Sequence, residues 1–135
     1  MPEKKGRIVV IDDDVQLVES VTTLLESVGY AVFSAYRAEK GFELAKEKQP
    51  DLILLDVMFA GPPGPDGFEI SRRMKQDADL KETPIVMLSG VKKVLELGYD
   101  VSPDDAFMPV EVFIDKPVKP EKLLATIDEV LKAGE

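Results

Sequence analysis

Short apolar runs alternate along the chain with longer stretches in which apolar residues recur every three or four positions. The runs have the length and the β-branched content of strands. They cover residues 7–11, 30–35, 51–58, 84–88 and 110–114. The run at 51–58 is flanked by aspartates and almost continuously apolar, which is typical of a strand buried on both faces of a parallel sheet.

The stretches between these runs predict helices. Asp14 is a natural N-cap for the first helix, and Gly29 is a natural stop. Residues 38–48 predict a second helix, which we expect Pro50 to end. Three further helices are predicted from Asp66 to about Gln76, at 91–97, and from Pro120 to Gly134. Two segments predict irregular structure because they are rich in proline and glycine, namely 59–65 and 98–109.

Five strands that alternate with five helices predict an α/β fold with a parallel sheet covered on both faces. Right-handed crossovers and the size of the chain favour a flavodoxin-like, doubly wound arrangement with strand order 2-1-3-4-5. We expect residues 1–135 to form a single domain.

Composition narrows the chemistry that this domain can perform. The chain has 135 residues, 44% of them hydrophobic and 32% charged, as in a soluble globular protein. It contains no cysteine and no histidine, which excludes thiol nucleophiles, imidazole metal ligands and a Ser-His-Asp triad. The net charge of -9 opposes binding to nucleic acid. No apolar run is long enough for a membrane span, so we expect a cytoplasmic protein that binds neither nucleic acid nor membranes.

Polar residues stand at or just after the point where four of the predicted strands leave the core. In the predicted fold these strand ends lie on one edge of the sheet, so the side chains should be neighbours. They are Asp12, Asp13, Asp56, Ser89 and Lys116. Taken singly, the aspartates also suit helix caps, the serine a turn and the lysine a solvated surface.

Three close carboxylates need a counter-charge, and a hard divalent cation supplies it. Mg²⁺ prefers oxygen ligands and should be held here by the three aspartates, with help from the backbone carbonyl of Met58. Mn²⁺ should fit as well. A carboxylate beside such an ion, with an amine and a hydroxyl nearby, suits phosphoryl transfer onto aspartate.

The sequence resembles the receiver domains of two-component response regulators over essentially its whole length. Residues 8–14 resemble the first strand and acidic pair of that family, and residues 51–58 with 65–69 resemble its phosphoacceptor segment. Residues 84–90 resemble its hydroxyl-bearing strand, and residues 113–117 resemble its Lys-Pro signature. The loop at 59–66 is longer than is usual in the family, and the segment at 98–109 is rearranged.

The resemblance implies roles for these residues. Asp56 would accept a phosphoryl group from a histidine kinase or a histidine phosphotransfer protein, with Asp12 and Asp13 holding Mg²⁺. Ser89 and Lys116 would contact the phosphoryl group. Phe113 would pack inward when Ser89 moves, which would alter the face formed by the fourth helix, the fifth strand and the fifth helix for an output partner.

Three other classes of function are weighed against this one, and the sequence disfavours the second and the third. The same fold could be a protein-binding module that does not use phosphorylation, although such domains usually lose some of the acidic or lysine residues that are present here. A haloacid-dehalogenase-type phosphatase would need a second aspartate at the position of Met58. A nucleotide-binding protein would need a glycine-rich loop after Ile11, where three aspartates stand instead. Since no DNA-binding helices are visible within the 135 residues, we expect that this chain is not itself a transcription factor, and a receiver domain cut from a longer protein stays an alternative.

Overall fold

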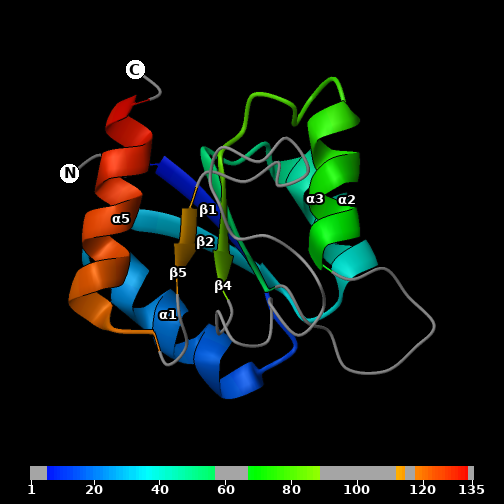
Figure 1. Ribbon diagram of the computed structural model, residues 1–135. Coiled ribbons are helices and arrows are strands. Elements are labelled where there is room, and N and C mark those ends of the chain that lie inside the picture. Colours follow the sequence, from blue (N-terminus) through cyan, green and yellow to red (C-terminus); the bar gives the residue numbers. More distant parts are fainter. Residues whose placement is uncertain (1–5, 57–66, 89–111, 115–117, 134–135) are drawn as a thin grey trace.

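A five-stranded parallel sheet forms the centre of the protein (Figure 1). The structure is a computed structural model and describes residues 6–56, 67–88, 112–114 and 118–133. The strands are β1 (Gly6–Ile11), β2 (Tyr30–Ala35), β3 (Leu52–Asp56), β4 (Ile85–Leu88) and β5 (Val112–Ile114). Their order is β2-β1-β3-β4-β5, so the predicted flavodoxin-like topology is confirmed.

Helices cover both faces of this sheet. The described helices are α1 (Val15–Ser27), α2 (Ala38–Lys48), α3 (Gly67–Gln76) and α5 (Pro120–Ala133). Successive side chains of β1 point to opposite faces of the sheet, which divides the core into two parts. Val9 packs with α2 and α3 on one face, whereas Val10 packs with α1 and α5 on the other. None of the helices within these described ranges combines the length and the apolar character needed to cross a bilayer.

The predicted elements agree with the observed ones to within one or two residues wherever the structure describes them. The predicted helix at 91–97 and the irregular segments at 59–65 and 98–109 lie outside the described residues. Val15, the first residue of α1, is 49% exposed because it stands in the first turn, before the helix passes over the sheet.

The ends of α1 and α2 show how local sequence sets the helix boundaries. The Asp14 side chain accepts a hydrogen bond from the Leu17 backbone N–H at 3.1 Å, which confirms the predicted N-cap. Gly29 has φ of 107°, a value that glycine adopts without strain. At the other helix, Gln49 takes a left-handed conformation and ends α2 one residue before Pro50. The Arg7 guanidinium donates to the Lys48 carbonyl at 2.6 Å and so satisfies one of the last carbonyls of α2.

Thr22 provides a test of packing on the α1 side of the sheet. Its Oγ1 is buried and has no hydrogen-bond partner among the described residues, which is an unfavourable state for a hydroxyl. We expect Thr22→Val, which replaces the hydroxyl by a methyl group of similar size, to raise the free energy of unfolding by about 1 kcal/mol. Urea denaturation measures this change.

The adjacent Thr23 is exposed and allows a matched control. Thr23→Val introduces the same chemical change where no buried hydroxyl is relieved, and we expect little change in stability. A loss of stability in Thr22→Val would show that this hydroxyl makes a favourable hydrogen bond in solution.

Candidate metal and phosphoryl site

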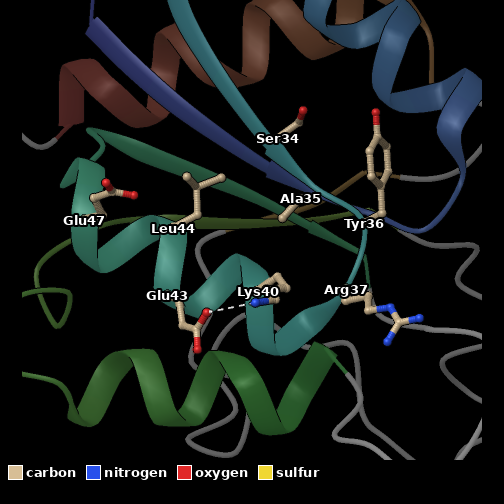
Figure 2. A pocket seen from close by; sticks show the side chains of 8 residues that line it. All are labelled: Ser34, Ala35, Tyr36, Arg37, Lys40, Glu43, Leu44 and Glu47. Atoms are coloured by element: carbon tan, nitrogen blue, oxygen red, sulfur yellow. Dashed lines mark ion pairs between the residues drawn. The ribbon is translucent and has the colours of Figure 1, made fainter.

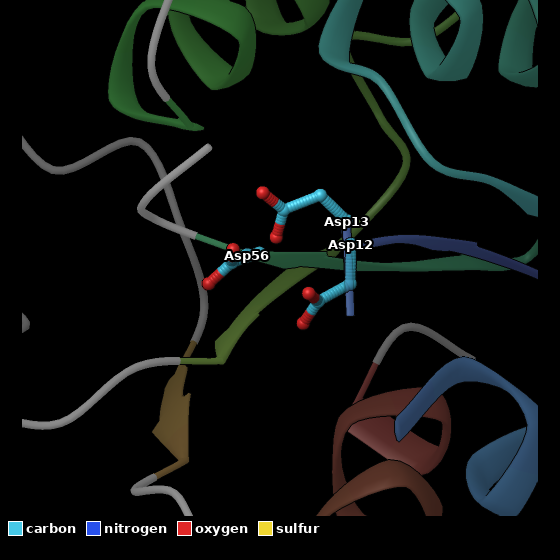
Figure 3. A group of neighbouring side chains, drawn as sticks. All are labelled: Asp12, Asp13 and Asp56. Carbon is cyan, nitrogen blue, oxygen red and sulfur yellow. The ribbon is translucent and has the colours of Figure 1, made fainter. Parts of the chain in front are cut away.

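Three aspartates meet at the C-terminal edge of the sheet. Asp12 and Asp13 directly follow β1, and Asp56 is the last residue of β3. These two strands are neighbours, and their register places Ile11 beside Leu55. One carboxylate oxygen from each aspartate lies within 4.8 Å of one from each of the others. Figure 3 shows the three side chains converging from the two strand ends.

Backbone hydrogen bonds hold Asp12 in place within this group. Its own N–H donates to the Ala35 carbonyl at 3.1 Å, which ties the end of β1 to the end of β2. Its Oδ1 accepts a hydrogen bond from the Asp14 N–H at 2.9 Å. Because Asp14 in turn caps α1, the carboxylate of Asp12 is oriented by the start of that helix. The cap could be predicted from the sequence and this second bond was not, although an aspartate that accepts from the N–H two residues on is a common turn signal.

The three carboxylates differ in their access to solvent. Asp12 is fully buried and Asp56 is 3% exposed, whereas Asp13 is the most accessible of the three. Buried carboxylates this close together repel each other, and a divalent cation relieves both the repulsion and the cost of burial. Oxygen donors of this kind fit Mg²⁺, and Asp13 leaves the group open to solvent on one side. The arrangement can therefore hold a hard cation next to an aspartate that can act as a covalent acceptor.

The remaining predicted site residues are only partly described. Phe113 lies in β5, where its backbone pairs with Met87, but its side chain is outside the described part of the protein. The backbone of β4 ends at Leu88, directly beside Asp56 in the register. Met58, Ser89 and Lys116 fall outside the described residues, so their roles stay predictions.

Comparison with known proteins agrees with the fold and the acidic group. The family model of the response regulator receiver domain matches residues 8–128. The transcriptional regulator RpaA of Synechocystis sp., described as DNA-binding, is 34% identical over 128 residues, which make up 93% of this chain and 49% of that protein. The phosphate regulon regulatory protein PhoB of Pseudomonas aeruginosa is 33% identical over 127 residues, or 93% of this chain and 51% of that protein. The chain thus spans about half the length of these curated relatives.

Two solved structures match over nearly their whole length. A CheY-like receiver domain protein from Methanospirillum hungatei has a TM-score of 0.78 and 26% identity, with 98% of this chain and 97% of that chain covered. The chemotaxis protein CheY4 of Vibrio cholerae has a TM-score of 0.74 and 26% identity, with 96% and 99% covered. The matched family model covers most of the chain and includes all three aspartates, so the chain belongs to the response regulator receiver domain family of two-component phosphoacceptors.

Proposed function

We propose that residues 1–135 act as one phosphoacceptor switch in which Asp56 is the residue that is phosphorylated. The observation that carries this proposal is the convergence of Asp12, Asp13 and Asp56 at one edge of the sheet, with their oxygens within 4.8 Å. Asp56 comes from the strand next to Asp12, so an ion held by the acidic pair would lie beside the acceptor.

In the proposed reaction, a carboxylate oxygen of Asp56 attacks the phosphorus of a phosphohistidine on a histidine kinase or a histidine phosphotransfer protein. The P–N bond breaks, the imidazole leaves with the electron pair, and an acyl phosphate forms on Asp56. Mg²⁺, held by the three aspartates and the Met58 carbonyl, would neutralise charge on the phosphoryl oxygens. Mn²⁺ is the expected substitute.

We assign the remaining steps from the family resemblance. Ser89 and Lys116 contact the phosphoryl group, and the movement of Ser89 allows Phe113 to pack inward. The resulting change on the face formed by the fourth helix, β5 and α5 alters the affinity for an output partner.

The test is the intact mass of the protein after incubation with acetyl phosphate and Mg²⁺. We expect the wild type to gain one phosphoryl group, and we expect no gain in Asp56→Asn or when EDTA removes the metal. Asp51→Asn is the matched control, because Asp51 directly precedes β3, away from the acidic group, and hydrogen-bonds the Arg7 N–H. This variant should accept the phosphoryl group as the wild type does.

Two results would count against the proposal. A phosphoryl gain that persists in Asp56→Asn would place the acceptor elsewhere. If the wild type gains no phosphoryl group and also fails to bind beryllofluoride, a phosphoryl mimic, the domain is better described as a phosphorylation-independent binding module.

A further inference from the structure

β2 is an edge strand without the usual protection against pairing. It stands at the end of the sheet order, so only β1 pairs with it among the described strands. Its six residues, Tyr30–Ala35, include no charge and no proline, and all six pair with β1 in unbroken register. Natural edge strands usually carry charges, proline or a bulge because bare edges pair with other chains. The outer edge of β2 is therefore suited to accept another strand.

A groove of about 590 Å³ runs alongside this edge, between the end of β2 and the outer side of α2 (Figure 2). Leu44 lies in the middle of its α2 wall, and Tyr36, at 43% exposure, lies beyond the end of β2. The other side chains of the α2 wall carry charge, and among these groove residues the two signs are separated, whereas the helix as a whole also carries Glu39 in its first turn and Lys46 and Lys48 in its last. Arg37 and Lys40 stand toward the start of α2, whereas Glu43 and Glu47 stand toward its end.

If a second copy is rotated by 180°, the positive end of its groove lies opposite the negative end of the first copy's groove. We propose that a second copy of this chain docks here about a two-fold axis, with the two β2 edges antiparallel and the two α2 helices side by side. In this arrangement Arg37 faces Glu47 of the second copy, and Glu47 faces Arg37 of the second copy. Every contact occurs twice, as a two-fold interface requires.

The charges also favour a second copy over an unrelated peptide. A peptide of one sign would meet attraction at one end of the groove and repulsion at the other, whereas the inverted copy meets attraction at both. Lys40 and Glu43 are 73% and 72% exposed and pair weakly with each other at 3.7 Å, so both can turn toward a new partner. Arg37 and Glu47 take part in no ion pair with other residues of the described ranges.

Sedimentation equilibrium of the unphosphorylated, metal-free protein tests the proposal. Because the interface is small and its charges are exposed, we expect a weak dimer with a Kd between about 10 µM and 1 mM, weakened further by salt. Arg37→Glu places like charges together at both ends of the interface, and so does Glu47→Lys. Each single variant should weaken association at least tenfold.

Mixing the two single variants provides the decisive measurement. In the mixed dimer, the glutamate introduced by Arg37→Glu faces the lysine introduced by Glu47→Lys, and the unchanged Glu47 and Arg37 still pair. The mixture should therefore form heterodimers about as well as the wild type forms homodimers. The same reasoning predicts that Arg37→Glu combined with Glu47→Lys in one chain restores the homodimer. Matched reversals on the exposed side of α5, Lys122→Glu and Glu129→Lys, should leave association unchanged.

A further variant tests the pairing between the β2 strands of the two copies. Ser34 is exposed on β2, and Ser34→Lys introduces the charge that guarded edges carry, so it should abolish the dimer while circular dichroism shows a folded protein. Asp56→Asn should leave the dimer intact, which separates this proposal from the phosphoacceptor role. The proposal is overturned if the wild type remains monomeric at 1 mM, about the upper limit of the expected Kd, if the reversed variants associate as well as the wild type, or if the mixture associates no better than its components.

Discussion

Replacing Gly41 by alanine is expected to destabilise the protein by about 2 kcal/mol. Gly41 lies in α2 on the face that rests against β1, and a Cβ placed there would come within 2.6 Å of three side-chain carbons of Ile11. Ile11 is fully buried, and its branched side chain has little freedom to turn aside. The helix or the strand end must therefore move.

The expected loss of stability is opposite in sign to the usual effect of this substitution. Glycine to alanine in the interior of a helix ordinarily stabilises by about 1 kcal/mol, because alanine loses less backbone entropy on folding. A net loss can arise here only if the steric contact with Ile11 exceeds that gain. Since Ile11 directly precedes Asp12, the same contact also sets how closely α2 packs behind the acidic group.

Urea denaturation of Gly41→Ala, Ile11→Val and the double variant measures the contact as a double-mutant cycle. The double variant moves one carbon from strand to helix and keeps the total volume. We therefore expect it to be more stable than the sum of the single changes predicts, by about 1 kcal/mol. A Gly41→Ala protein that is more stable than the wild type would refute the close packing.

Asp56→Asn is expected to raise the stability of the metal-free protein by about 1–2 kcal/mol, because it removes one charge from the acidic group. Two ionised groups about 4 Å apart repel by about 4 kcal/mol at an effective dielectric constant of about 20, and hydrogen bonding and proton uptake offset part of this. Asparagine has nearly the same shape as aspartate but carries no charge. The variant should therefore relieve the repulsion without creating a cavity.

The same substitution should remove the effect of Mg²⁺ on stability. An ion that binds only the folded wild type stabilises it by about 2.7 kcal/mol at a concentration about 100 times its dissociation constant. Thermal unfolding with and without Mg²⁺ measures both effects. Asp79→Asn, at an exposed acid in the turn after α3, is the control and should keep the full response to Mg²⁺. Equal stabilisation of Asp56→Asn by Mg²⁺ would show that Asp56 is not a ligand.

Much of the fold could be predicted from the spacing of apolar residues, because buried positions in a helix or a strand are mostly apolar. The continuous apolar run of β3 indicated a strand buried on both faces, and all five of its residues are indeed buried. Asp14 and Gly29 marked the ends of α1 correctly because capping depends on a few adjacent residues. The 49% exposure of Val15 could not be predicted, because helical spacing does not say where along its length a helix meets the sheet.

The acidic group could be predicted only in part. The sequence placed Asp12, Asp13 and Asp56 at strand ends, and the rule that parallel strands end at one edge brought them together. Their separation and the different exposures of Asp12 and Asp13 could not be predicted, because they depend on the register of β1 against β3 and on the turn into α1. The signal for that turn was present in three successive aspartates, but it does not specify which oxygen accepts which N–H.

The sequence by itself determined the number of strands, their parallel order and the acidic chemistry at their ends, since these follow from local patterns and from general rules of chain connection. Only the tertiary structure decided how closely Gly41 approaches Ile11, how close the oxygens of the three aspartates lie, and that a groove lined by charged residues of α2 lies beside the edge of β2. These features join residues far apart in the chain. Their distances arise from the packing of whole elements, and no local pattern encodes that packing.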